Sequence, residues 1–466
     1  MNYATTLPAV MPLLGNAALD CPALVTREHL WTWREVHRAA AELAAKLEPG
    51  ATICNMCGSR AGFLITWLAA LRSSNLQLLP PSGGSADLIS LLRSSARPLI
   101  IVDAARLVDV RWQEHAPCLV HEPRVTTPLL ADESVKWTPN WDRVSVQLYT
   151  SGSTGAPEAQ TRTLRQLTHG ALALGAALEG FVEGGLAAVR GMVCSVAPQH
   201  MFGLETSVML SLVSGIPVHE GRPLLASDVQ AALSSSARGT AWIATPLHLR
   251  ACAQAEDVLP NCNLVISSTM PLARDLAAEI ERIAAAPVVE IYGSTETGAI
   301  ATRRVARSPR WQPLPGVSLQ STVHAPQHHV EGQHFTSPQP LQDQILVCND
   351  GGFELLGRTG DMIKIAGRRA SLAGLNLLLQ DLPGLGDGVF YLPRTGDATQ
   401  RLILIHDGPP LERGATDAWL RARLDPTFLP RNIIRVTRLP RSDNGKLTEA
   451  SLARIFAEWS EGTERS

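Results

Sequence analysis

Short apolar runs alternate with longer alanine- and leucine-rich stretches over most of this chain. The runs at 99–102, 192–196, 264–266 and 288–291 have the length and composition of strands. Two of the longer stretches, 30–47 and 272–285, have the periodicity of helices. Strands that alternate with helices predict α/β layers built on largely parallel sheets. The chain has 466 residues, 45% of them hydrophobic, which is enough for several such folding units.

The composition changes near residue 317, where histidine, glutamine and proline increase and short strands such as 344–348 replace the α/β alternation. After Gly357-Arg358 the chain continues as a compact segment with the size of a separate domain. We therefore predict an α/β protein in two parts. Residues 1–358 form a large N-terminal domain of layered α/β subdomains with a small β-rich subdomain, and residues 359–466 form a small α+β C-terminal domain.

Charge and hydropathy favour a small-molecule substrate. Lys and Arg number 41 against 43 Asp and Glu, so nothing in the overall charge indicates nucleic acid or an anionic membrane. The longest strongly apolar stretch, 61–71, is far short of the ~20 residues that span a bilayer. The N-terminus lacks a basic region and contains Pro8 and Pro12, which argues against a secretory signal. We expect no membrane span and a cytoplasmic location.

Eight cysteines are scattered along the chain, and the close pair is Cys54 with Cys57. A Cys-x-x-Cys pair is typical of redox and zinc sites, but no second Cys/His pair has zinc-finger spacing. Since Ile53, Met56 and Phe63 flank the pair, we expect both thiols to be buried in a core, without a metal.

Residues 149–155 read Tyr-Thr-Ser-Gly-Ser-Thr-Gly directly after the apolar run 144–148. Glycines let backbone N–H groups approach an anion, and the hydroxyls add donors, so this composition indicates a phosphate-binding loop. An ordinary turn is the alternative. The loop is neither a Walker motif nor a nucleophile elbow, because it lacks Gly-Lys-Ser/Thr and Gly-x-Ser-x-Gly. Glu158 stands where a lysine usually closes such a loop, and Arg162 could supply the cation instead.

Three further groups of residues follow the loop in a fixed order. They are Tyr292-Gly293-Ser294-Thr295-Glu296, then Asp343 with Gly357-Arg358 and Asp361, then Leu439-Pro440-Arg441 with Gly445-Lys446. Together with the loop, and over nearly the whole chain, they resemble the adenylate-forming superfamily of acyl- and aryl-CoA synthetases, adenylation domains and luciferases. The resemblance implies that ATP and Mg²⁺ convert a carboxylic acid to its acyl- or aryl-AMP. A thiol, either coenzyme A or the phosphopantetheine of an acyl carrier protein, then captures the acyl group.

The resemblance also implies roles for single residues. It places Tyr292 against adenine, Thr295 at the α-phosphate, Glu296 on Mg²⁺, and Asp343 with Arg358 at the ribose. Lys446 is assigned to the carboxylate and α-phosphate during adenylation, and Asp361 to the hinge on which the mobile C-terminal domain turns. The other candidates for the phosphate and adenine sites are Thr150, Ser151, Gly152, Ser153, Thr154, Gly155, Ser268, Thr269 and Gly293.

The segment His200-Met201-Phe202-Gly203 resembles the helix that lines the acid pocket of the superfamily, so we assign His200, Phe202 and Gly203 to that pocket. Amino-acid adenylation domains typically have an aspartate at the position of Gly203, and an unpaired buried ammonium is costly. We therefore expect an aryl acid such as a hydroxybenzoate, or a short- to medium-chain acyl acid as the alternative.

Several residues depart from the superfamily pattern. They are Glu158, the segment Ser268-Thr269-Met270-Pro271 in place of Gly-Gly-Ala-Pro, and Gly374 and Asn376 in place of acidic residues. These changes leave a catalytically silent nucleotide-binding homologue as a second hypothesis. A weaker resemblance to aryl-polyene and xanthomonadin-type ligases favours a carrier protein as partner. Four arginines could meet such an acidic partner: Arg421, Arg423, Arg431 and Arg435.

Overall fold

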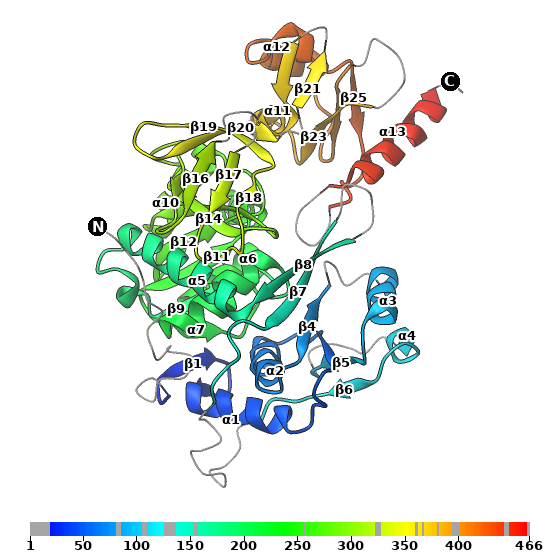
Figure 1. The fold of residues 1–466 in the computed structure, drawn as a ribbon. Coiled ribbons are helices and arrows are strands. Elements are labelled where there is room, and N and C mark those ends of the chain that lie inside the picture. Colours follow the sequence, from blue (N-terminus) through cyan, green and yellow to red (C-terminus); the bar gives the residue numbers. More distant parts are fainter. Residues whose placement is uncertain are drawn as a thin grey trace. The chain divides into compact units, whose positions relative to one another are not determined.

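The structure is a computed structural model of the chain (Figure 1). It describes residues 19–80, 85–104, 110–124, 137–151, 157–255, 258–321, 328–358, 362–365, 368–379, 382–393, 401–441 and 447–463. The chain divides into two compact units. One comprises Met1–Ser268, Arg274–Gln320 and Val330–Gln339, and the other comprises Thr269–Ala273, Ser321–His329 and Pro340–Ser466. The predicted boundary after residue 358 stays a prediction.

A six-stranded sheet in the first unit has the order β6–β5–β3–β4–β7–β8. Its neighbours pair in parallel except for the antiparallel hairpin β7–β8 at one edge (Figure 1). The strands are β3 (Thr52–Asn55), β4 (Leu76–Leu79), β5 (Pro98–Val102), β6 (Cys118–Val120), β7 (Val144–Ser151) and β8 (Pro157–Thr163). Parallel neighbours need crossover connections, which α2 (Arg60–Arg72), α3 (Ser85–Ser94) and α4 (Val110–Gln113) supply.

Both faces of this sheet are covered, as a parallel sheet requires. Side chains alternate along each strand, so Ile53 and Leu79 enter the core shared with α2, whereas Cys54 and Leu78 pack with Leu88 and Leu92 of α3. Cys57 belongs to the core on the α2 side, and both cysteines of the pair are buried thiols. The structure thus confirms the expectation that this Cys-x-x-Cys is part of the core.

A nine-stranded sheet forms the rest of the first unit, in the order β15–β14–β13–β12–β11–β9–β10–β1–β2. Its middle is parallel, and β2, β14 and β15 pair antiparallel at its edges. The strands are β1 (Pro22–Val25), β2 (Leu30–Thr32), β9 (Gly191–Cys194), β10 (Val218–His219), β11 (Thr240–Ala244), β12 (Cys262–Ser267), β13 (Val288–Ser294), β14 (Gly298–Arg303) and β15 (Gln312–Pro313). The helices between these strands are α5 (Leu164–Leu178), α6 (Met201–Gly203), α7 (Leu210–Ser214), α8 (Ala226–Ser234), α9 (Pro246–Ala255) and α10 (Arg274–Ala284).

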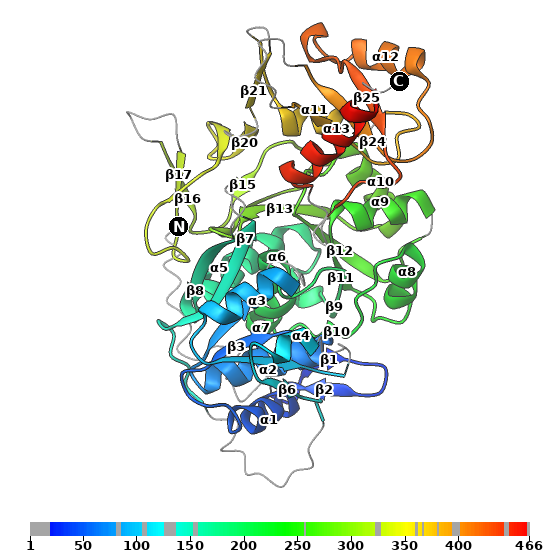
Figure 2. The same ribbon diagram turned by 90° about the vertical axis from the view of Figure 1, so that its right-hand side faces the viewer.

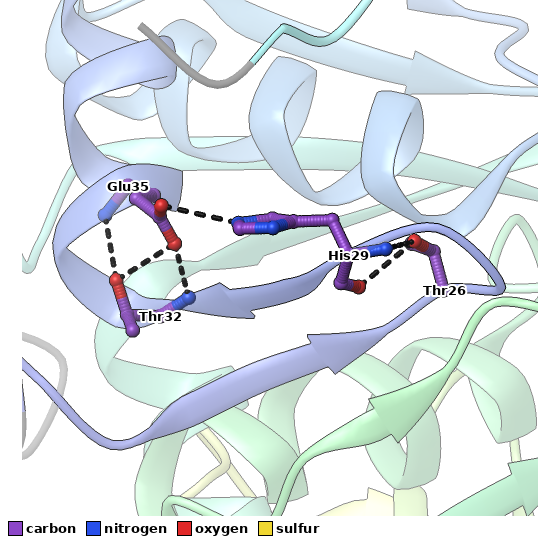
Figure 3. A network of polar contacts seen from close by, with 4 residues as sticks. All are labelled: Thr26, His29, Thr32 and Glu35. Atoms are coloured by element: carbon purple, nitrogen blue, oxygen red, sulfur yellow. Dashed lines mark hydrogen bonds and ion pairs between the residues drawn. The ribbon is translucent and has the colours of Figure 1, made fainter. Parts of the chain in front are cut away.

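Helix α1 (Trp33–Ala44) begins three residues later than the periodicity of 30–47 predicted, because Leu30–Thr32 pairs with β1 as strand β2. Thr32 ends the strand and caps the helix: its Oγ1 accepts from the Glu35 amide at 3.3 Å, and Glu35 Oε2 accepts from the Thr32 amide at 2.7 Å. His29 adds a contact to Glu35 at 3.1 Å (Figure 3). A capping box of this kind fixes the start of a helix regardless of the apolar periodicity before it.

The second unit contains three small antiparallel or mixed sheets. β19 (Asp343–Val347) pairs with β20 (Phe353–Arg358), and β21 (Met362–Ile365) pairs with β22 (Arg368–Ser371). The third sheet has the order β23–β24–β25, with bounds Gly388–Tyr391, Ile403–His406 and Asn432–Arg435. A further small sheet, near the segments that divide the units, consists of β16 (Ser318–Ser321), β17 (His328–Glu331) and β18 (Gln339–Pro340).

Helices cover both faces of the sheet β23–β24–β25 (Figure 2). Phe390, Leu402 and Leu404 face α11 (Leu372–Leu379) and α12 (Arg413–Arg421). Tyr391 and Ile405, one residue out of phase, face α13 (Glu449–Thr463). This alternation gives the unit its own core on each side of the sheet. The fold is the predicted α/β architecture with smaller β-rich and α+β parts.

No helix among the described residues is long and apolar enough to cross a membrane.

Candidate functional site

The predicted Thr295 and Glu296 lie in the tight turn of the antiparallel hairpin β13–β14. Reciprocal hydrogen bonds fix this turn: the Ser294 amide donates to Thr297 Oγ1 at 3.0 Å, and the Thr297 amide donates to Ser294 Oγ at 3.2 Å. Gly293 and Gly298 make the turn sterically possible. A Cβ on Gly293 would lie 2.0 Å from the Gly298 carbonyl oxygen, and Gly298 has a φ of +67°. The sequence Tyr-Gly-Ser-Thr-Glu thus encodes a rigid tip.

The tip presents two polar side chains that make no hydrogen bond within the described part of the protein. Thr295 and Glu296 are half-buried, and among the described residues none makes a hydrogen bond with the Thr295 hydroxyl or the Glu296 carboxylate. The described residues also contain no group of three or more His, Cys, Asp or Glu side chains that could hold a metal. One open carboxylate fits Mg²⁺ that completes its shell with water and substrate phosphate oxygens.

Arg162, on β8, binds the backbone of this tip. Its Nη2 donates to the carbonyl oxygen of Thr295 at 3.0 Å and also to that of Glu296. Burial lowers the pKa of this guanidinium, and the carboxylates of Glu205 and Glu296 act in the opposite direction. The sequence proposed Arg162 as a cation for phosphate. The structure shows that it binds the backbone of the predicted metal-binding turn, and its role toward phosphate stays a prediction.

The first residues of the predicted phosphate loop belong to a strand. Tyr149, Thr150 and Ser151 complete β7, and Thr150 is the register partner of Glu158 on β8. Gly152, Ser153, Thr154 and Gly155 lie outside the described residues. Glu158 itself is exposed. Arg162, which contacts the β13–β14 turn, thus belongs to the same hairpin as the predicted loop.

Tyr292 lies one strand position before the turn and is supported from one side by aromatic packing. Its ring centroid is 5.4 Å from that of Trp311, and the Arg303 guanidinium lies 4.2 Å from the Trp311 centroid. Arg303 is also paired with the buried Glu290 at 2.7 Å. This stack fixes the orientation of Tyr292, as a ring that lies against a planar base requires. Ser268, another adenine-site candidate, donates to the Ile291 carbonyl oxygen at 2.9 Å.

The remaining nucleotide-site candidates belong to the second unit. Thr269 adopts a φ of +84°, a region that β-branched residues rarely enter, and it stands where the superfamily has glycine. Asp343 and Arg358 are register partners across the hairpin β19–β20. Gly357 precedes Arg358 with a φ of +130° at an irregularity of that pairing. The predicted ribose pair is thus brought together on adjacent strands.

The predicted acid-pocket residues begin one irregular helix. His200 precedes α6, which contains Phe202 and Gly203, and the helix continues as a π-helix over Leu204–Met209 before α7. Inserted π-helical turns are frequent at functional sites. A Cβ on Gly203 would lie 1.9 Å from the Ala197 carbonyl oxygen. An aspartate side chain at this position would therefore collide with the backbone, and the exclusion of amino-acid substrates stays a prediction.

Glu205 is the functional candidate that sequence reasoning missed. It lies on the π-helix with 6% of its surface exposed, and both carboxylate oxygens accept from the Ala299 amide, at 3.1 and 3.0 Å. Burial raises its pKa to about 7, while the Ala299 amide and Arg162 lower it. The available signal was a glutamate in the otherwise uncharged run Met-Phe-Gly-Leu-Glu-Thr-Ser-Val-Met-Leu.

Lys446 and Asp361 lie outside the described residues. The chain just before Lys446 is well anchored: Arg441 is paired with Asp387 through both guanidinium branches, one of them at 2.8 Å. Asp407 accepts from the Leu439 amide at 3.1 Å and from the Asp387 amide at 2.9 Å. The segment Leu-Pro-Arg therefore starts the predicted lysine loop from a fixed position on the sheet β23–β24–β25.

The sequence matches the AMP-binding enzyme family over residues 15–325. The chain belongs to this family. The match confirms the predicted membership of the adenylate-forming superfamily and the predicted enzyme class, an AMP-forming acid–thiol ligase.

Among curated proteins, a 4-coumarate–CoA ligase of Cereibacter sphaeroides is 26% identical over 307 residues, which cover 64% of this chain and 69% of that protein. The enterobactin synthase component F of Shigella flexneri is 22% identical, and the match covers 96% of this chain but 39% of that protein. The chain thus spans less than half the length of this second relative.

The fold matches o-succinylbenzoate CoA synthetase of Bacillus subtilis in complex with its acyl-adenylate. The TM-score is 0.79 at 17% identity, over 95% of this chain and 98% of that chain. The same enzyme is also known in complex with ATP and a magnesium ion, with a TM-score of 0.77 at 18% identity over 92% of this chain and 95% of that chain. At these identities the likeness concerns the fold.

Proposed function

We propose that this AMP-binding enzyme activates an aryl carboxylic acid as its aroyl-AMP and transfers the aroyl group to a thiol. The observation that carries the proposal is the β13–β14 turn, which presents the Thr295 hydroxyl and the Glu296 carboxylate without hydrogen-bond partners among the described residues. Arg162 holds the two carbonyl groups beneath them. A fixed donor and a fixed carboxylate suit a reaction whose catalysis is mainly positioning and charge stabilisation.

In the first half-reaction, a carboxylate oxygen of the acid attacks the α-phosphorus of ATP and pyrophosphate leaves in line. Thr295 donates a hydrogen bond to an α-phosphate oxygen, and Lys446 offsets the charge that develops between the carboxylate and the α-phosphate. Tyr292 lies against adenine, and Asp343 accepts from the ribose hydroxyls, with Arg358 beside it. The hydroxyls and backbone of residues 150–155 hold the outgoing phosphates, and Arg162 compensates for the acidic Glu158.

Glu296 would hold Mg²⁺, which supplies charge neutralisation on the phosphate oxygens when it is bound. In the second half-reaction, a thiolate attacks the acyl carbon and AMP leaves with the electron pair of the broken C–O bond. The C-terminal domain turns at Asp361 between the two half-reactions. Since ATP, coenzyme A and acyl carrier proteins occur in the cytoplasm, we place the reaction there.

The proposed substrate class rests on the helix that begins at His200. Gly203 leaves no room for an acidic partner of an α-ammonium, so a neutral ring next to the carboxylate fits better than an amino acid. The 4-coumarate–CoA ligase and the o-succinylbenzoate CoA synthetase to which the chain is similar act, by name, on acids that contain an aromatic ring. A short- or medium-chain acyl acid is the alternative within the same reaction.

The thiol acceptor is either coenzyme A or an acyl carrier protein. Arg421, Arg423, Arg431 and Arg435 are exposed in the second unit, and exposed arginines attract an acidic carrier protein. The 4-coumarate relative uses coenzyme A by name. Parallel assays with coenzyme A and with a set of phosphopantetheinylated carrier proteins distinguish the two.

Carboxylate-dependent ATP–pyrophosphate exchange tests the proposal. We expect exchange with hydroxybenzoates or related aryl acids, and a loss of about 10²-fold or more for Glu296→Gln, by analogy with the removal of one preorganised catalytic group. ATP binding without exchange, across aryl, short-chain and medium-chain acids, would refute the proposal. That result would favour a catalytically silent nucleotide-binding homologue, the second candidate, which the replacement of the loop lysine by Glu158 motivates.

A further inference from the structure

We propose that Glu205 is a positioning residue for Mg·ATP: it anchors the β13–β14 hairpin behind Glu296 and shares with Glu296 the positive charge of Arg162. The proposal rests on the proposed function, because it assigns Mg²⁺ to Glu296. Glu205 does not itself contact the nucleotide in this scheme. It acts through the backbone of the hairpin and through the charge of Arg162.

The first step of the argument is steric. The Glu205 carboxylate receives the Ala299 amide on both oxygens, three residues after Glu296. A Cβ on Gly298 would lie 2.3 Å from Glu205 Oε1, and a Cβ on Gly170 of α5 would lie 3.4 Å from the same atom. The carboxylate thus lies directly against the hairpin and close to α5. A shift of the π-helix that carries Glu205 would displace the hairpin.

The second step concerns charge. Arg162 interacts electrostatically with two carboxylates, Glu205 and Glu296. If Glu205 carried no charge, Glu296 would be the one of these two carboxylates that still attracts the Arg162 guanidinium. The guanidinium would then compete with Mg²⁺ for the Glu296 oxygens, and its own positive charge would repel the ion. Glu205 therefore shares the charge of Arg162 and leaves the Glu296 side chain to the metal.

Among the described residues, His334 and His169 are the further titratable groups near this cluster, and His169 lies on α5. Burial lowers the pKa of His334 to about 4, with Arg162 and His169 acting in the same direction and the Ala299 backbone against them. Burial also lowers the pKa of His169, helped by Arg165. Both histidines are therefore neutral near pH 7, and Arg162 is the cation that offsets Glu205. Protonation of Glu205 below about pH 7 would weaken this arrangement.

The decisive measurement is the Mg²⁺-dependent part of nucleotide affinity, which does not need turnover. Calorimetric titration with α,β-methylene-ATP gives the ratio of the affinity in the presence of Mg²⁺ to the affinity in its absence. We expect Glu205→Gln to reduce this ratio about 10-fold at pH 8, the effect of breaking one coupled charge interaction. Protonation of the terminal phosphate of the nucleotide lowers the ratio in both proteins as the pH drops below 7. We expect the ratio to fall more steeply in the parent protein than in Glu205→Gln, because the parent protein also loses the charge of Glu205.

Glu220→Gln is the matched control. Glu220 is also a carboxylate with a raised pKa due mainly to burial, and it accepts from the Arg60 and Ala61 amides at 2.7 and 3.0 Å at the start of α2. Its removal should leave the ratio unchanged within about twofold. A second arm uses Arg162→Met: if Glu205 acts through Arg162, the double variant loses less than the sum of the two single variants.

Equal changes of the ratio in Glu205→Gln and Glu220→Gln, or the same pH dependence of the ratio in the parent protein and in Glu205→Gln between pH 5.5 and 8.5, would overturn the inference. If Glu205→Gln does not fold, the pH dependence of the parent protein is compared with that of Arg162→Met, which lacks the cation through which Glu205 acts. Pyrophosphate exchange tests the proposed function independently of this inference. Absent pyrophosphate exchange with every acid, together with a Glu205-dependent Mg²⁺ effect, would reject the ligase and retain this inference.

Discussion

Replacement of Glu205 by glutamine should make the protein more stable at alkaline pH. In the folded chain, burial raises the pKa of this carboxyl from 4.5 to about 7, although the Ala299 amide and Arg162 oppose the shift. A raised folded-state pKa means that folding favours the protonated form. The contribution of Glu205 to stability is therefore full below about pH 4.5 and is lost as the pH rises through about 7.

The magnitude follows from the two pKa values. The interval from 4.5 to about 7, at about 1.4 kcal/mol per pH unit, corresponds to about 3 kcal/mol in the free energy of unfolding. About two thirds of it develops between pH 5.5 and 8.5, because the unfolded carboxyl is already ionised at the lower limit. Glutamine keeps an oxygen for the Ala299 amide and carries no charge, so it does not incur this cost.

Urea unfolding of Glu205→Gln and of the parent protein, followed by tryptophan fluorescence at pH 5.5 and 8.5, measures the effect. We expect the stability difference between the two proteins to shift in favour of the variant by about 2 kcal/mol at the higher pH. Glu183→Gln, at an exposed site, is the control and should show no such shift. If the difference is the same at both pH values, the Glu205 carboxyl is not held in a costly ionised state and the reasoning is wrong.

Three further predictions concern the nucleotide site. Lys446→Ala should slow adenylation by roughly 10²-fold, about 3 kcal/mol of transition-state stabilisation, and unchanged pyrophosphate exchange would contradict its role. Arg162→Ala should raise the KM for ATP more than Glu158→Ala, since Arg162 binds the Thr295 and Glu296 carbonyl groups while Glu158 is exposed; the reverse order in steady-state kinetics would refute this. Thr269→Gly should stabilise the second unit by about 1 kcal/mol, because glycine adopts a φ of +84° without strain, and an unchanged urea midpoint would argue against it.

The sequence predicted the parts of the fold that depend on local patterns. The runs at 99–102 and 288–291 lie in the strands β5 and β13, and 272–285 contains helix α10. A turn after the run 288–291 was also predicted, and it joins β13 to β14, while its functional role stays a prediction. The predictions of structure succeeded because hydrophobic period and turn chemistry are local in the chain.

The remaining features depend on contacts between distant segments. The helix predicted from residue 30 begins at Trp33 because β1 pairs with Leu30–Thr32, which no helical period reveals. The contacts of Arg162 with Thr295 and Glu296 join residues more than 130 positions apart in the chain. Glu205 was missed for the same reason. Its partner Ala299 contributes a backbone amide, and side-chain identity carries no record of that donor.

Gly203 limits how the specificity of this enzyme can be redesigned. An engineer who wants an amino-acid-activating variant would first restore the aspartate of amino-acid adenylation domains at this position. Its Cβ would lie 1.9 Å from the Ala197 carbonyl oxygen and 3.2 Å from Pro198 Cα, so the single substitution collides with backbone rather than with a movable side chain. A library that varies pocket side chains on this scaffold would not reach that activity. The loop at 197–198 has to be rebuilt together with the helix that follows it.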